Sequence, residues 1–303
     1  MPPGEMEPFL WLAAFALCAV LHLVIHPQAR LFRDALGWLG RHPAPFLWLM
    51  ASLMVHEAWS LRTGAPPPPI VAEPLSPWPD VFLDCATRGW QRFAMLFHQA
   101  VYPPPIFVGT VPGAAIMGLF SAMGQMWLCC YLVTSRDSLM PDAAVRPALA
   151  RWRTILVLAV IHAAWWWMAE RTDTTTRALR DWLMPEFLVF LGPVPLAAAA
   201  ARVDFLEAGA LAVRWWGRVW LPMLMFALTA VPLLVLLEYT LHLLPAMLPP
   251  ARMVTRLLLA SILDAALHSW LFVSAALLLL RGGYLDHEPS HARQDIQPCP
   301  RGP

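Results

Sequence analysis

Residues 221–244 read LPMLMFALTAVPLLVLLEYTLHLL and residues 257–280 read LLLASILDAALHSWLFVSAALLLL, and these two apolar runs decide the fold. The short proline-rich turn PAMLPPA, residues 245–251, separates them. A membrane-crossing helix needs about 20 apolar residues at ~1.5 Å per residue, and each run meets this length. The sequence therefore predicts two antiparallel transmembrane helices that are joined by a tight turn.

The composition of the whole chain is also that of a membrane protein. Of its 303 residues, 59% are hydrophobic and only 14% are charged, which is too apolar for an ordinary soluble domain. The formal net charge is +1, so no strong overall field indicates a nucleic-acid partner. All 21 basic residues are arginines, which excludes chemistry that depends on a catalytic or phosphate-binding lysine.

Apolar runs recur along most of the chain and are separated by arginines and prolines. We predict an all-α fold, a polytopic transmembrane helix bundle of about seven spans with interfacial amphipathic helices, as a single domain over residues 1–281. Six spans is the alternative, because the second and fourth runs are short. The polar tail, residues 282–303, is predicted to be disordered and cytoplasmic. The predicted spans are approximately 8–25, 45–61, 106–133, 154–169, 182–201, 220–244 and 257–280.

Residues 63–105 form a predicted external loop with two different parts. Residues 63–80 are rich in proline, which favours an extended, polyproline-like backbone. In residues 81–101, apolar side chains instead recur at helical spacing, and polar side chains occupy the opposite face, which includes Arg88 and Arg92. We expect an amphipathic helix that buries its apolar face in the outer interface or on the bundle, with both arginines facing water or headgroups. Its apolar positions are Phe82, Ala86, Phe93, Phe97 and Val101.

The distribution of arginines predicts how the chain is oriented. The segments 26–43, 134–153 and 201–218, together with the tail, hold 13 of the 21 arginines. The positive-inside rule places these segments in the cytoplasm, so the N-terminus is external and the C-terminus is cytoplasmic. We interpret the exclusive use of arginine as a bacterial trait, which predicts a location in the bacterial inner (cytoplasmic) membrane.

A stripe of small residues marks the third predicted span. Ala114, Gly118 and Ala122 are four residues apart and therefore lie on one face of a helix. Small side chains let two helix backbones approach closely inside a membrane. We expect another helix to pack against this stripe.

The two runs that decide the fold each carry an acid and a histidine four residues apart. These pairs are Glu238 with His242 and Asp264 with His268. From the helical rise, both acids are expected about 10 Å from the outer ends of their spans, at matching depth. The acids should therefore meet directly or share His268 between them. In the second predicted span, His56 and Glu57 also fall in the outer half, which completes a candidate polar intramembrane cluster.

Three interpretations of this cluster remain open. Ionisable groups in a membrane usually face the bundle interior, where they can carry protons or ions. Imidazoles and carboxylates can also bind a metal ion such as zinc or iron. The third interpretation is structural, because polar side chains hydrogen-bond neighbouring membrane helices to one another. His162, alone in the fourth span, is interpreted as a packed hydrogen-bonding residue.

These interpretations lead to three hypotheses about function. The first is a non-enzymatic scaffold or subunit of a membrane, envelope or transport system, whose external loop meets a partner or the membrane surface. The second is a transporter or a proton- or ion-conducting protein that uses the polar cluster. The third is an intramembrane metalloenzyme. The lipid bilayer and other membrane subunits are the candidate partners, and no motif implies a cofactor other than a metal bound by the His, Asp and Glu side chains.

Overall fold

The computed structural model describes residues 28–63, 78–98, 110–134, 141–169, 173–179, 183–248 and 253–281, together with Ala13, Leu17, Val20, Leu21 and Val24. Every regular element among these residues is a helix, which confirms the predicted all-α class. Most of the first predicted span, most of the proline-rich segment and the predicted disordered tail lie outside the described residues.

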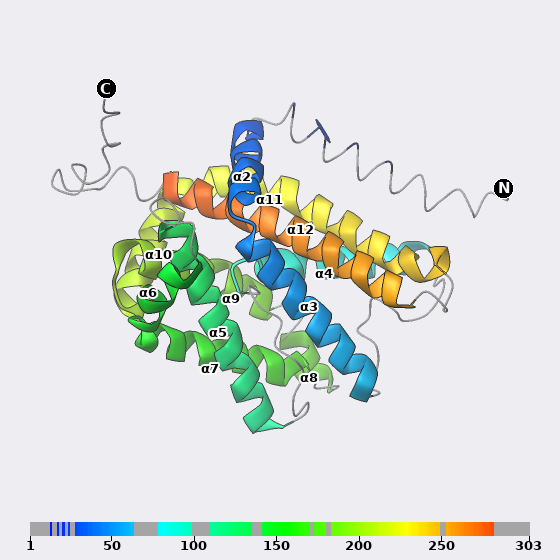
Figure 1. Cartoon of the computed structure of the whole chain (residues 1–303), viewed down its shortest axis with the longest axis horizontal. Coiled ribbons are helices and arrows are strands. Elements are labelled where there is room, and N and C mark those ends of the chain that lie inside the picture. Colours follow the sequence, from blue (N-terminus) through cyan, green and yellow to red (C-terminus); the bar gives the residue numbers. More distant parts are fainter. Residues whose placement is uncertain are drawn as a thin grey trace.

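The helices α11 (Phe205–Met247) and α12 (Met253–Leu279) contain the two long apolar runs and lie side by side along the long axis of the molecule (Figure 1). The remaining elements are, in chain order, α2 (Ala29–Arg41), α3 (Ala44–Thr63), α4 (Trp78–Ala94), α5 (Val111–Thr134), the 3-10 helix η2 (Pro141–Ala144), α6 (Val145–Leu149), α7 (Trp152–Ala169), α8 (Thr174–Ala178), α9 (Met184–Leu191) and α10 (Pro193–Ala201).

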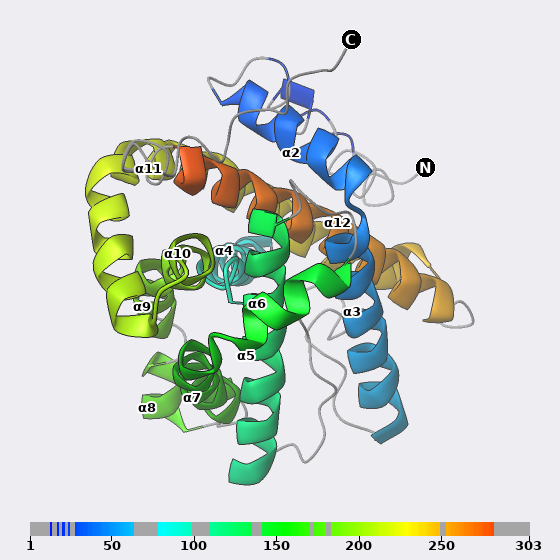
Figure 2. The ribbon, with the colours of Figure 1, turned by 60° about the vertical axis from the view of Figure 1, so that its left-hand side comes forward.

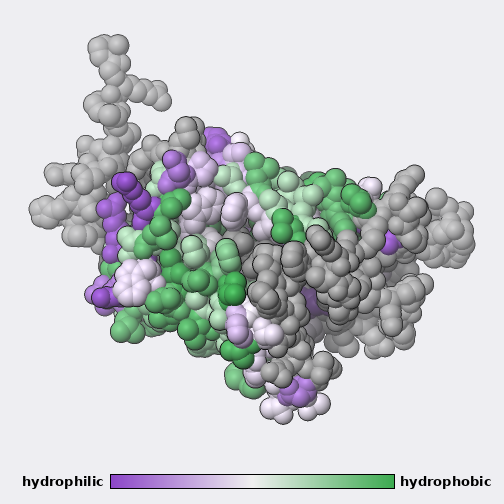
Figure 3. All heavy atoms as spheres, turned by 60° about the horizontal axis from the view of Figure 1, so that its bottom comes forward, coloured by the Kyte–Doolittle hydropathy of each residue, from purple (hydrophilic) through white to green (hydrophobic). Residues whose placement is uncertain are grey.

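Among the described residues, four helical stretches are long and apolar enough to cross a bilayer, and the chain is therefore a membrane protein. Hydrophobic residues make up much of the coloured surface in Figure 3, while hydrophilic residues gather mainly toward its left-hand end. The predicted number of about seven spans is not confirmed, although α3 and α7 occupy the predicted second and fourth spans. The four stretches are Val111–Thr134, Met184–Ala201, Phe205–Leu241 and Val254–Leu279.

Helix α11 is longer than the span predicted for it. It has 43 residues, which corresponds to roughly 65 Å of helix, whereas the hydrocarbon core of a bilayer is about 30 Å thick. The arginine-containing segment 205–218 continues into the apolar run without a break. The boundary predicted at residue 220 is therefore a change in composition within one helix.

Helix α4 occupies the centre of the bundle. Figure 2 looks nearly along its axis and shows α5, α10 and α12 around it. Phe93 and Phe97 are buried, as expected for the apolar face of an amphipathic segment. Phe97 packs edge-on against Phe272 of α12, with ring centroids 5.7 Å apart. Instead of covering the outside of the bundle in the headgroup layer, α4 packs mainly on α11 inside the bundle.

The small-residue stripe on α5 packs against α7, as predicted. Ala114, Gly118 and Ala122 are all buried. A Cβ atom at Gly118 would lie 2.4 Å from the carbonyl oxygen of Ala159 and 2.5 Å from the amide nitrogen of Ala163. The backbones of α5 and α7 therefore touch at a point where no side chain fits between them.

Helix α2 is amphipathic and lies on α12. Its apolar side buries Leu31, Phe32 and Ala35, and Phe32 stacks on Phe226 of α11 at a centroid distance of 5.7 Å. Trp270 of α12 donates its indole N–H to the carbonyl oxygen of Phe32 over 3.0 Å. This hydrogen bond and the aromatic stack attach α2 to both long helices.

An aromatic stack fixes the junction between α2 and α3. The ring of His42 lies 4.7 Å from Trp38, and Tyr131 of α5 contacts its Nδ1 atom at 3.4 Å. Burial, together with the positive charge of Arg41, lowers the pKa of His42 from its ordinary value. A neutral imidazole at physiological pH suits this stacked position, because a charged ring there would be partly desolvated.

Candidate functional site

The carboxyl groups of Glu238 and Asp264 come from the two long helices and point into the bundle. Both residues are buried, with only 4% of each exposed. Their helices pack against one another, as the tight turn between the apolar runs predicted. The two acids do not share His268, however. The residue that joins them is Arg92 of α4.

A close helix contact brings Arg92 to this position. Gly89 lies against Val235 of α11, and a Cβ atom at Gly89 would be 2.6 Å from the Cγ2 atom and 2.9 Å from the amide nitrogen of Val235. Residues three apart lie on the same side of a helix. Arg92 therefore follows Gly89 onto the face that meets α11, where Glu238 follows Val235 by the same spacing. The absence of a side chain at Gly89 lets the two helices come close enough for this pairing.

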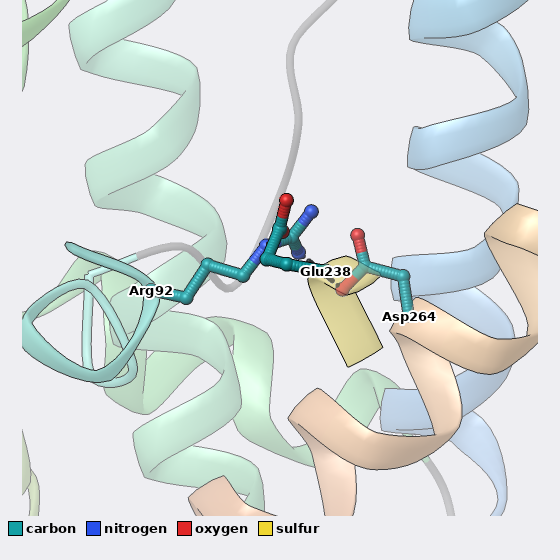
Figure 4. Close-up of polar contacts among 3 residues, drawn as sticks. All are labelled: Arg92, Glu238 and Asp264. Atoms are coloured by element: carbon teal, nitrogen blue, oxygen red, sulfur yellow. Dashed lines mark hydrogen bonds and ion pairs between the residues drawn. The ribbon is translucent and has the colours of Figure 1, made fainter. Parts of the chain in front are cut away.

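The guanidinium of Arg92 contacts both acids (Figure 4). Its Nε atom donates to Oε1 of Glu238, and its Nη1 atom donates to Oδ1 of Asp264 over 2.6 Å. The exposed fraction is 14% for the Arg92 side chain and 5% for each acid. We call these three residues the arginine clamp. The expectation that Arg92 faces water or headgroups was wrong, because its partners lie inside the bundle.

The arginine clamp contains more acids than bases. An arginine remains protonated in proteins, so two ionised carboxylates would leave one excess negative charge among the three residues. A buried charge without a partner costs several kcal/mol. A further positive charge close to the clamp would offset this excess.

His268 is the nearest protonatable neighbour of the clamp on α12. It follows Asp264 by one helical turn and is only 2% exposed. Its ring interacts with the backbone of Leu96 and lies within electrostatic reach of Asp264 and Arg92. The charge state of His268 is therefore coupled to the charges of Asp264 and Arg92.

A second buried polar cluster lies where the chain leaves α4. Nδ1 of His98 is 3.2 Å from Nε2 of His162 on α7, and Nε2 of His98 is 3.0 Å from the carbonyl oxygen of Leu188 on α9. Since that carbonyl can only accept, Nε2 of His98 carries the proton and Nδ1 is the acceptor. Gln125 of α5 donates to the carbonyl oxygen of Phe97. His162 is thus a packed hydrogen-bonding residue, as the sequence indicated.

Among the other members of the predicted cluster, only His56 has a described side chain. His56 is half-buried on α3, and its ring lies 6.2 Å from that of Trp166 on α7. The side chains of Glu57 and His242 lie outside the described residues. Within the described part of the chain, no three His, Cys, Asp or Glu side chains are grouped to hold a metal ion. At the clamp itself, a guanidinium occupies the position between the carboxylates that a metal cation would need.

The residues that sequence reasoning missed are Arg92, His98 and Gln125. All three belong to or contact the segment 92–98, which lies within the amphipathic helix predicted over residues 81–101. One signal was available in the sequence, because two acids inside apolar spans require a buried cation as partner. Arg92 lies on a helix with a strong apolar face and was a candidate for that partner.

Comparison of the chain with protein-family models, with curated proteins and with solved structures finds no match in any of the three.

Proposed function

We propose that this membrane protein moves protons across the bilayer, with the arginine clamp and His268 as the proton-binding site. The observation that carries the proposal is the excess of carboxylates over guanidinium in a site with both acids buried. A proton bound at this site would offset the excess negative charge. Ionisable residues at this depth in membrane proteins commonly mark proton and ion paths.

In this proposal, each residue of the site has a different role. Arg92 keeps its proton, so the mobile proton is carried by Glu238, Asp264 or His268. Asp264 is the central carrier because it contacts Arg92 on one side and has His268 one turn along the same helix. When Asp264 is protonated, its attraction to Arg92 weakens, and the guanidinium is held mainly by Glu238. Proton binding and the attachment of α4 to α12 are therefore coupled.

One experiment measures this function directly. The full chain is reconstituted in liposomes that contain a pH-sensitive dye, and a potassium gradient with valinomycin drives proton entry. We expect proton flux from the wild type and no flux above that of empty liposomes from Asp264→Asn. The matched control is Asp34→Asn, since Asp34 forms a surface ion pair with Arg281 far from any buried acid of the clamp.

The same experiment separates the second candidate function, a membrane scaffold or subunit. This candidate is favoured by the way in which Arg92 ties α4 to both α11 and α12. If the wild type shows no flux above empty liposomes, the proton hypothesis is overturned and the scaffold remains. Elution of each variant as a single peak in size-exclusion chromatography shows that lost flux does not arise from misfolding.

For the location, we propose a multi-pass protein of a bacterial inner membrane, with an external N-terminus and a cytoplasmic C-terminus. The excess of arginines in segments on one side supports this orientation. Reporter domains fused at Met1 and at Pro303 should therefore report opposite sides of the membrane. Reporters that both score on the same side would exclude an odd number of spans.

A further inference from the structure

An apolar groove of about 680 Å³ lies on the side of the bundle where α3 and α5 diverge. It forms because α3 packs on α12 while α5 packs on α7, and the short elements η2 and α6 cross the space between them. Its volume is within the range of about 300–1,000 Å³ that is typical of ligand pockets. Trp48, Phe120, Met123 and Leu149 line it, and each of these side chains is at least 40% exposed.

One end of the groove is polar and the rest is apolar. Asp142 of η2 lines this end, and Arg146 follows it by four residues on α6. Both are exposed, and neither is engaged in an ion pair within the described part of the chain. Trp127 donates its indole N–H to the carbonyl oxygen of Pro141 over 3.0 Å, which fixes η2 against α5. An acid thus lines an otherwise apolar channel, and a base follows it in the next helix.

We propose that this groove binds one phospholipid whose headgroup carries a primary ammonium and a phosphate, as in phosphatidylethanolamine. An acyl chain fills the apolar channel between α3 and α5 and contacts the apolar helix surfaces that line it. The ammonium pairs with Asp142 and the phosphate with Arg146, so the charges of groove and headgroup are complementary. The arginine-rich segment 134–153, predicted to lie at the cytoplasmic boundary, places these two residues at headgroup depth.

The groove is distinguished from ordinary lipid-facing surface by its shape and by its two charges. An annular lipid contacts a convex helix surface and exchanges freely. In the groove, a chain is enclosed by helices on two sides, and the rings of Trp48 and Trp127, 5.9 Å apart, narrow the space between α3 and α5. A purely apolar surface would not discriminate between headgroups, whereas Asp142 attracts an ammonium and repels an anionic headgroup that lacks one.

Native mass spectrometry of the full chain tests the proposal. The protein is reconstituted with equal amounts of phosphatidylethanolamine and phosphatidylglycerol, extracted in mild detergent, and analysed for retained lipid. We expect one retained phosphatidylethanolamine on the wild type. Ala51→Trp fills the groove from α3 and should lower retention about tenfold, which corresponds to ~1.4 kcal/mol. Asp142→Asn should remove the preference for phosphatidylethanolamine while some lipid is still retained.

Val160→Trp is the matched control, because Val160 on α7 is 71% exposed and does not line the groove. It adds the same ring to the lipid-facing surface and should leave retention unchanged. Equal retention of both lipids by the wild type, or equal retention by Ala51→Trp and Val160→Trp, would overturn the proposal and leave annular lipid only. The proton-flux measurement with Asp264→Asn does not depend on either result.

Discussion

Replacing Arg92 by methionine should lower the free energy of unfolding by about 3–5 kcal/mol, the usual cost of removing one partner from a buried ion pair. The methionine retains most of the apolar stem but leaves Glu238 and Asp264 facing one another without a cation. Both acids are 95% buried or more, so water cannot replace the guanidinium cheaply. Titration with sodium dodecyl sulfate in mixed micelles, followed by tryptophan fluorescence, measures the loss.

Two further variants test the cause of that loss. Arg33→Met removes an exposed arginine from α2 and should change stability by less than about 0.5 kcal/mol, as surface substitutions usually do. The triple variant Arg92→Met, Glu238→Gln, Asp264→Asn removes every charge of the clamp and should regain most of the lost stability, because no unpaired charge remains. Wild-type stability in Arg92→Met alone would show that the clamp is not a buried ion pair in the membrane.

The triple variant also separates structure from function. If the clamp only holds helices together, the neutral protein keeps whatever activity the wild type has. If it carries protons, the neutral protein is folded but shows no proton flux, since none of the three replaced side chains titrates in the physiological range. A stable and inactive triple variant would therefore support the proton proposal in a way that the unstable single variant does not.

The long helices could be predicted from sequence because their hydrophobicity exceeds what a soluble chain carries over that length. The burial of Glu238 and Asp264 followed from the cost of exposing an acid to lipid. Arg92 could not be placed by the same reasoning. Helical spacing showed that Arg92 lies opposite the phenylalanines of its helix, but an amphipathic helix can turn its polar face to water or to buried counter-charges. Only the tertiary arrangement decides whether the polar face meets water or buried counter-charges.

The contact between α4 and α11 shows why the position of Arg92 could not be predicted from the sequence. It depends on Gly89, one glycine in a helix of ordinary composition, whose importance is visible only beside Val235. The stripe on α5 was easier to recognise, because three small residues recur at the spacing of one helix face. His98 and Gln125 were missed since their partners include the backbone carbonyls of Leu188 and Phe97, which no side-chain pattern reveals.

The second large effect is expected at Gly118, where the helix contact is closest. Gly118→Ala should destabilise the protein by about 1–3 kcal/mol, the usual cost of overpacking a dense interior. The new Cβ atom would meet the backbone of α7 at 2.4 Å and 2.5 Å, and neither a carbonyl oxygen nor an amide nitrogen in a helix can move aside alone. Helices α5 and α7 must therefore separate along their length. The resulting loss in the free energy of unfolding is measured by the same detergent titration.

Gly217→Ala is the same substitution at a position where we expect the opposite change in stability. Gly217 lies in the interior of α11, and a Cβ atom there would meet nothing within 4 Å. Alanine favours a helix over glycine by up to about 1 kcal/mol, so this variant should be as stable as the wild type or slightly more stable. Gly118→Ala gains the same helix propensity, so the difference in stability between the two variants reports the lost packing alone. Equal stability of the two variants would contradict direct backbone contact between α5 and α7, because only that contact gives the two substitutions opposite signs.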